Sequence, residues 1–176
     1  MKTNLAIFGS LAALAMAIPA GATLPTPSDA AATQNAQAFL FKAGAGDIFE
    51  IVTSSMAVQK STNPAVRAFA AMIIADHTNA TNTALATAAA AGVMAPPPEL
   101  SPMQKDMIGQ LMAAAPATFD RVYLSQQVPA HQQALALLQG YAARGDVPAL
   151  RTAATQTVPV VAGHLSQAQG LLAAAR

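Results

Sequence analysis

Residues 61–84 read STNPAVRAFAAMIIADHTNATNTA, and this stretch decides the fold class. Asn63 followed by Pro64 is typical of a helix start, with asparagine as the N-cap and proline at the first helical position. Apolar residues then recur at intervals of three and four, which predicts a helix with one buried stripe. The stripe is apolar except at a single histidine, and its members are Val66, Ala70, Ile73, His77, Ala80 and Ala84.

Similar signals predict helices along the rest of the chain. Gly92 fits a C-terminal cap, the run Ala95-Pro96-Pro97-Pro98 cannot be helical, and Gly145-Asp146 is expected to end one helix and cap the next. No stretch alternates with a period of two residues, so we expect no sheet. The expected helices cover residues 32–60, 64–91, 101–114, 116–144 and 147–176.

A weak internal repeat indicates how these helices are arranged. Pro64-Ala65-Val66-Arg67 and Pro148-Ala149-Leu150-Arg151 each open a helix that follows a helix of similar length. Chance similarity between two alanine-rich helix starts would explain the repeat equally well. We predict an all-α fold: an antiparallel four-helix bundle of the ferritin-like type, with hairpins 32–91 and 116–176. The connector 92–115 would be one long crossover that contains a short extra helix.

The N-terminus has the pattern of a signal peptide over residues 1–22. Lys2 precedes an apolar run from Leu5 to Ile18, and Ala20-Gly21-Ala22 fits a small-residue cleavage site. The run is short for a membrane span, although an uncleaved anchor is the alternative. Residues 23–31 would be a flexible leader. We therefore expect an exported, periplasmic or envelope-associated protein with no transmembrane span after cleavage.

The composition excludes several classes of function. Of the 176 residues only 10% are charged, the formal net charge is +1, and no basic stripe is visible, so nucleic acid is not an expected partner. The chain has no cysteine, which excludes disulfides and thiolate ligands. No G-x-S-x-G elbow or phosphate-binding glycine loop occurs. The sequence therefore favours a non-enzymatic protein and leaves the oligomeric state open.

The three histidines all lie on stripes that are otherwise apolar, and Glu50 lies in the first expected long helix. Glu50 precedes Pro64 by 14 residues and His77 follows it by 13, while His131 precedes Pro148 by 17 residues and His164 follows it by 16. In an antiparallel hairpin equal offsets mean equal heights, at about 1.5 Å per residue. The spacing predicts that one polar side chain from each long helix meets the others in the core.

Such a cluster has two interpretations. Imidazole and carboxylate groups suit iron, zinc, copper or nickel, so the four residues could hold one transition-metal ion, with Asp47 and Asp76 orienting the ligands. Alternatively, the cluster is a buried hydrogen-bond network that fixes the helix register without a metal. The candidate ligands are Glu50, His77, His131 and His164.

The same motifs carry a family resemblance. Asp76-His77-Thr78, Phe119-Asp120-Arg121-Val122-Tyr123 and Ala130-His131-Gln132, together with Asn63 to Ala70 and His164-Leu165, resemble the exported bacterial family called domain of unknown function 4142. The resemblance covers residues 37–172. It implies a ferritin-like fold and export but no settled activity.

No Glu-x-x-His motif is present, so no di-iron centre is expected. Two hypotheses of function remain. The first is a non-enzymatic envelope protein whose His/Glu cluster is structural. The second is a mononuclear metal-binding bundle protein, with redox activity as an option.

Overall fold

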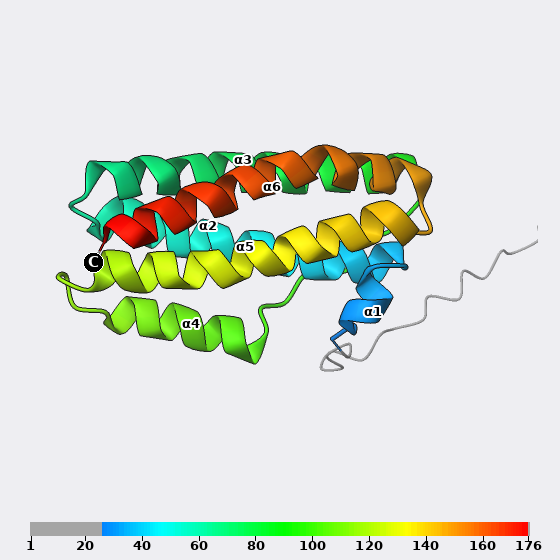
Figure 1. The fold of residues 1–176 in the computed structure, drawn as a ribbon. Coiled ribbons are helices and arrows are strands. Elements are labelled where there is room, and N and C mark those ends of the chain that lie inside the picture. Colours follow the sequence, from blue (N-terminus) through cyan, green and yellow to red (C-terminus); the bar gives the residue numbers. More distant parts are fainter. Residues whose placement is uncertain (1–25, 176) are drawn as a thin grey trace, which may run out of the picture.

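A computed structural model describes residues 26–175, and within this range the chain contains six helices and no strand (Figure 1). The expectation of an all-helical protein is therefore confirmed. The predicted signal peptide and the first residues of the predicted leader lie outside the described residues. The helices are α1 (Asp29–Ala32), α2 (Ala36–Lys60), α3 (Pro64–Ala90), α4 (Pro102–Ala113), α5 (Phe119–Arg144) and α6 (Pro148–Ala174).

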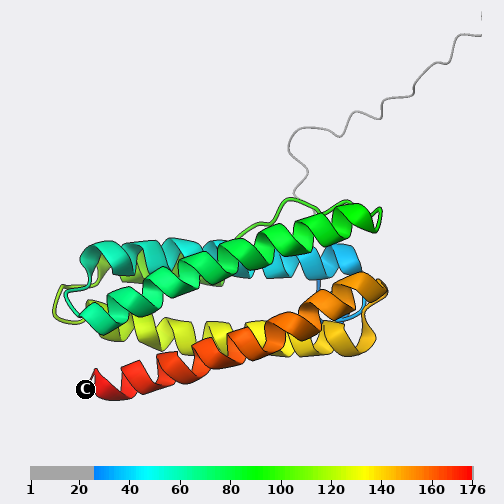
Figure 2. The same ribbon diagram turned by 90° about the horizontal axis from the view of Figure 1, so that it is seen from above.

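Four long helices lie side by side as two hairpins, α2 with α3 and α5 with α6 (Figures 1 and 2). Helix α3 also packs against α6, and α2 packs against α5, so the four helices enclose a common interior. The shorter α4 lies outside this group, where it contacts α2 and α5. Within the described residues, no helix combines the length and the apolarity that a membrane span requires.

The helix starts that the sequence indicates at Pro64 and Ser101 are present, whereas α5 begins at Phe119 and not at residue 116. The side-chain oxygen of Asn63 accepts the N–H of Ala65 at 2.9 Å, and Pro64 occupies the first turn of α3. Ser101 and Gln104 form the reciprocal capping box at the start of α4. Gly92 has a φ of 71°, which is the left-handed conformation expected just after a helix end.

The start of the first long helix differs from the expectation. The predicted leader contains the single helical turn α1, because the Ser28 hydroxyl accepts the N–H of Ala31 at 3.2 Å. Helix α2 then begins at Ala36 and not at residue 32. Its start is set by Asn35, whose side-chain oxygen accepts the N–H of Ala38 at 3.0 Å.

The expected cap at Asp146 is wrong. Val147 occupies the N-cap position of α6 and makes no side-chain capping bond. The Asp146 carboxylate instead accepts the hydroxyl of Tyr141 at 3.0 Å, and its backbone N–H donates to the Gln34 carbonyl at 2.9 Å. These bonds tie the turn between α5 and α6 to the segment before α2.

The apolar core is divided into two clusters along the helix axes. One contains Phe69, Phe119 and Tyr123, near the turn between α2 and α3. The other lies toward the opposite end of the molecule and contains Phe39, stacked on Tyr141 with ring centroids 4.1 Å apart. All three histidines are buried but belong to neither cluster, so they form a polar layer within an apolar interior.

Candidate metal centre

The three histidines come from three different helices and meet in the interior. His77 lies on α3, His131 on α5 and His164 on α6, and their exposed fractions are 5%, 0% and 3%. The ring centroids form a nearly equilateral triangle with sides of 5.6, 5.7 and 5.5 Å. One potential ligand atom from each ring lies within 4.8 Å of the other two. We call these residues the three-histidine cluster.

The backbone of α5 fixes the tautomer of His131. Its Nδ1 lies 2.9 Å from the carbonyl oxygen of Gln127, one helical turn earlier. A carbonyl can only accept a hydrogen bond, so Nδ1 carries the proton. In the neutral ring, Nε2 therefore carries the lone pair.

Carboxylates from neighbouring helices orient the other two rings. His77 Nδ1 lies 2.8 Å from Asp47 on α2, and His164 Nε2 lies 2.8 Å from Asp76 on α3. An ionised carboxylate can only accept, so these ring nitrogens are the donors. The structure thus places both predicted orienting residues against an imidazole N–H. This is the usual arrangement around histidines that bind metals.

The remaining nitrogen of each ring has no hydrogen-bond partner in the structure. These atoms are His77 Nε2, His131 Nε2 and His164 Nδ1, and all three are buried. In neutral rings they are the lone-pair nitrogens. A buried polar atom without a partner costs roughly 1–3 kcal/mol, so three such atoms in one place require an explanation.

Glu50 lies beside the cluster and not within its group of mutually close ligand atoms. Its Oε1 is 3.5 Å from His131 Nδ1, whose proton is directed to the Gln127 carbonyl, and its Oε2 has no partner. Burial raises the pKa of Glu50 to about 8, although the charge on His77 and a hydrogen bond from Gln127 oppose this shift. The carboxyl group is therefore neutral at pH 7.

The three imidazoles differ in the direction in which their surroundings shift the pKa. Burial lowers the pKa of His131 to about 4, against the hydrogen bond to the Gln127 carbonyl, and burial also lowers the pKa of His164. Burial acts in the same direction on His77, but the hydrogen bond to Asp47 and the neighbouring carboxylates outweigh it, so the pKa of His77 is raised. His131 and Glu50 are 3.5 Å apart, but burial favours the neutral form of both.

Several polar contacts around the cluster were not predicted from the sequence. The Gln127 side chain donates to the Thr53 hydroxyl at 3.2 Å, and the hydroxyls of Ser54 and Tyr123 are 2.8 Å apart. All four residues are buried. Polar residues at inward positions of α2 and α5 were the only available signal, because a contact between residues about 70 positions apart leaves no local pattern.

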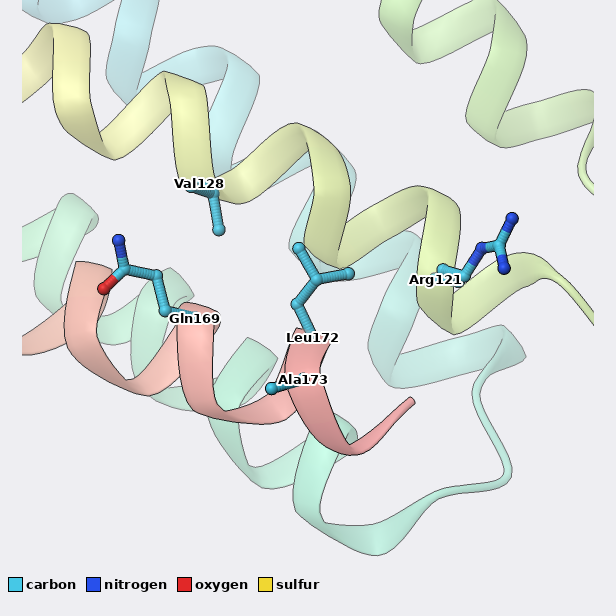
Figure 3. Close-up of a pocket in the computed structure, with 5 residues that line it drawn as sticks. All are labelled: Arg121, Val128, Gln169, Leu172 and Ala173. Atoms are coloured by element: carbon cyan, nitrogen blue, oxygen red, sulfur yellow. The ribbon is translucent and has the colours of Figure 1, made fainter. Parts of the chain in front are cut away.

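A small hollow lies between α5 and α6 near the C-terminus (Figure 3). It has a volume of about 330 Å³ and is lined by Arg121, Val128, Gln169, Leu172 and Ala173. Leu172 points toward α5 in this view, and Arg121 is the single charged residue of the five. None of these five residues is a histidine or an acidic residue.

Comparison with known proteins places the chain in a family. Residues 21–171 match the model described as domain of unknown function (DUF4142). The chain belongs to the DUF4142 family. No curated protein matches this DUF4142 chain.

Two solved structures share the fold of this DUF4142 protein. One is described as CopM in the Cu(II)-bound form, with 18% identity, a TM-score of 0.67, and coverage of 78% of this chain and 95% of CopM. The other is a DUF305 fragment from Deinococcus radiodurans, with 17% identity, a TM-score of 0.68, and coverage of 85% of this chain and 99% of the fragment. At these identities the likeness concerns the fold alone.

Proposed function

We propose that this DUF4142 protein is a non-enzymatic envelope protein that binds one transition-metal ion at the three-histidine cluster. The observation that carries the proposal is a set of three buried ring nitrogens without hydrogen-bond partners, one from each of three helices, in a group of histidines whose potential ligand atoms lie within 4.8 Å of one another. A metal ion bound to all three would satisfy them at once. The oppositely directed N–H groups already have the acceptors that metal-binding histidines require.

The spacing of the nitrogens is close to that of a metal site. A point equidistant from three atoms 4.8 Å apart lies about 2.8 Å from each, compared with metal–nitrogen bonds of about 2.0–2.1 Å. Each ring would have to move inward by roughly 0.7 Å at most, which small side-chain rotations can provide. Asp47 and Asp76 already accept imidazole N–H groups, so Glu50 is the nearby carboxyl group that remains to act as a metal ligand. We therefore propose a mononuclear site and no di-iron centre.

The chemistry of the donors limits the choice of metal. Three neutral imidazoles suit copper, zinc, nickel or iron, and among the divalent ions Cu²⁺ binds most tightly to a given nitrogen site. The Cu²⁺-bound state of CopM, a protein of the same fold, supports testing copper first. The inferred role is to hold the ion, and this role requires no substrate.

The proposal includes an architecture and a compartment. We infer that the four long helices form an antiparallel bundle of the ferritin-like type, with α4 in the crossover between the hairpins. We also infer that residues 1–22 direct export and are removed. The basis for export is the Lys2, apolar-run and Ala20-Gly21-Ala22 pattern of the sequence.

A second candidate function is a structural network that fixes the helix register without a metal. It is favoured by the hydrogen bonds His77–Asp47 and His164–Asp76, which join α3 to α2 and α6 to α3 and are complete without any ion. Polar contacts between helices can favour one register of packed helices over another.

Substitutions that keep the hydrogen bond of each ring and remove only its free nitrogen separate the two functions. In His131→Asn, the amide nitrogen can replace Nδ1 as donor to the Gln127 carbonyl, while Nε2 is lost. In His164→Gln, the amide nitrogen can replace Nε2 as donor to Asp76, while Nδ1 is lost. Metal stoichiometry would be measured by elemental analysis, and the free energy of unfolding by urea denaturation with EDTA or with Cu²⁺, Zn²⁺ or Ni²⁺.

For the unaltered protein we expect one ion per chain and, at an ion concentration 100-fold above Kd, a stabilisation of about 2.7 kcal/mol. Both variants should lose this stabilisation by metal. In EDTA, their free energy of unfolding should differ little from that of the unaltered protein. If the unaltered protein takes up no ion and gains no stability from any of the three metals, metal binding is ruled out and the structural network remains.

A further inference from the structure

A large cavity reaches the three-histidine cluster from the surface. It has a volume of about 1160 Å³, and residues from all six helices line it. His77, His164 and Glu50 form part of its wall, whereas exposed residues such as Asp29 and Met103 line it elsewhere. We call this space the interior cavity. Its volume is slightly above the usual range of small-molecule sites, which is about 300–1000 Å³.

Small side chains at inward positions explain why this space is present. Ala80 and Ala84 on α3, Ala134 on α5 and Ala154 on α6 all line the interior cavity. Alanine fills little of the distance between facing helices, and a packed interior normally contains few voids larger than a water molecule. No residue of the apolar cluster near the turn between α2 and α3 lines the interior cavity, whereas Phe39, Leu138 and Leu150 of the other cluster do. The space therefore lies on the side of the histidine layer away from that turn.

The lining has the polarity of a ligand site. Much of the wall is alanine, leucine, valine and phenylalanine, whereas the cluster contributes buried atoms without partners, namely His77 Nε2, His164 Nδ1 and Glu50 Oε2. Each of these side chains is at least 95% buried. An apolar pocket with a few convergent polar groups is typical of sites that bind small organic molecules.

The charges around the interior cavity select against anions. Five acidic residues line it, Asp29, Asp47, Glu50, Asp76 and Glu99, and Lys42 is the only lysine or arginine among its lining residues. Lys42 is already paired with Asp29. A carboxylate or phosphate ligand would enter a region of like charge, which disfavours its binding.

We propose that the interior cavity binds a small neutral organic molecule with an apolar body and one polar head group, and that the head group faces the three-histidine cluster. The proposed binding of the apolar body does not depend on a bound metal ion. The proposed orientation of the head group rests on the proposed function, because it places the head group beside the three-histidine cluster and next to the ion bound there.

The neutral fluorescent probe N-phenyl-1-naphthylamine tests binding of the body. It would be titrated into the full chain in EDTA, so that a failure of metal binding leaves this result unaffected. Ala134→Leu and Ala154→Leu place larger side chains in the cavity, and Ala86→Leu, at an exposed site on α3 outside the lining, is the matched control. We expect saturable binding that is at least tenfold weaker in both cavity variants and unchanged in the control.

Competition on the unaltered protein tests the head group and does not depend on how well the variants fold. 2-Naphthol and naphthalene have the same apolar body, and only the former carries a neutral hydroxyl group. We expect 2-naphthol to displace the probe at a concentration at least tenfold lower than naphthalene. Absence of probe binding, or equal binding by folded cavity variants, would overturn the proposal. Equal displacement by the two competitors would overturn the orientation of the head group.

Discussion

Glu50→Gln should change how the stability of the metal-free protein depends on pH. The Glu50 carboxyl is 3% exposed, and burial raises its pKa from an ordinary value of 4.5 to about 8. Between these two values the unfolded chain releases the proton while the folded chain retains it. The stability from the protonated carboxyl is therefore complete below pH 4.5 and is lost as the pH rises to about 8.

The size of the effect follows from linkage. Stability should fall by about 1.4 kcal/mol per pH unit over this window, which amounts to on the order of 5 kcal/mol in total. Glutamine has nearly the same shape as the neutral acid and cannot ionise. The variant should lack this loss, and its stability relative to the unaltered protein should increase steadily from pH 5 to pH 8.

The assay is urea unfolding followed by far-UV circular dichroism, in EDTA, at pH 5, 6, 7 and 8 for both proteins. His131 contributes an opposite slope, because its pKa in the folded protein is lowered to about 4. As the pH falls below 6.5, the unfolded chain takes up a proton that the folded chain does not, and stability decreases. Comparison of the two proteins at each pH largely cancels this contribution. A difference in unfolding free energy that stays constant from pH 5 to pH 8 would refute the reasoning, because Glu50 would then be ionised in the folded protein.

Three further substitutions test individual packing and hydrogen-bond contacts of the fold. Gly145→Ala should lower stability by about 1–3 kcal/mol, because the new methyl group would lie 2.5 Å from the fully buried ring of Tyr141. Gly170→Ala, at an exposed helical site with open space, should instead raise it by about 0.5–1 kcal/mol, and thermal denaturation compares the two. Tyr123→Phe should cost about 1–2 kcal/mol in urea unfolding, because the buried Ser54 hydroxyl loses its partner; an unchanged midpoint would contradict this contact.

Local patterns in the sequence were sufficient to predict most of the helices. The Asn63-Pro64 start, the Ser101 capping box and the Gly92 cap are set by contacts within a few residues, which a sequence displays directly. The prediction was wrong at Asp146, because a capping side chain can instead bond to a distant partner. Its actual partners, Tyr141 and Gln34, become neighbours only when α5 packs beside the start of α2.

By itself, the sequence determined which face of each helix is buried and at what height each histidine lies, because helical periodicity and the rise per residue are properties of one chain segment. Only the tertiary structure decided which ring nitrogens are free, because this depends on acceptors such as Asp47 and Asp76 on neighbouring helices. It also placed Glu50 beside the cluster and left the interior cavity open. The rotation and spacing of packed helices depend on all facing side chains together, so no single stretch of sequence specifies them.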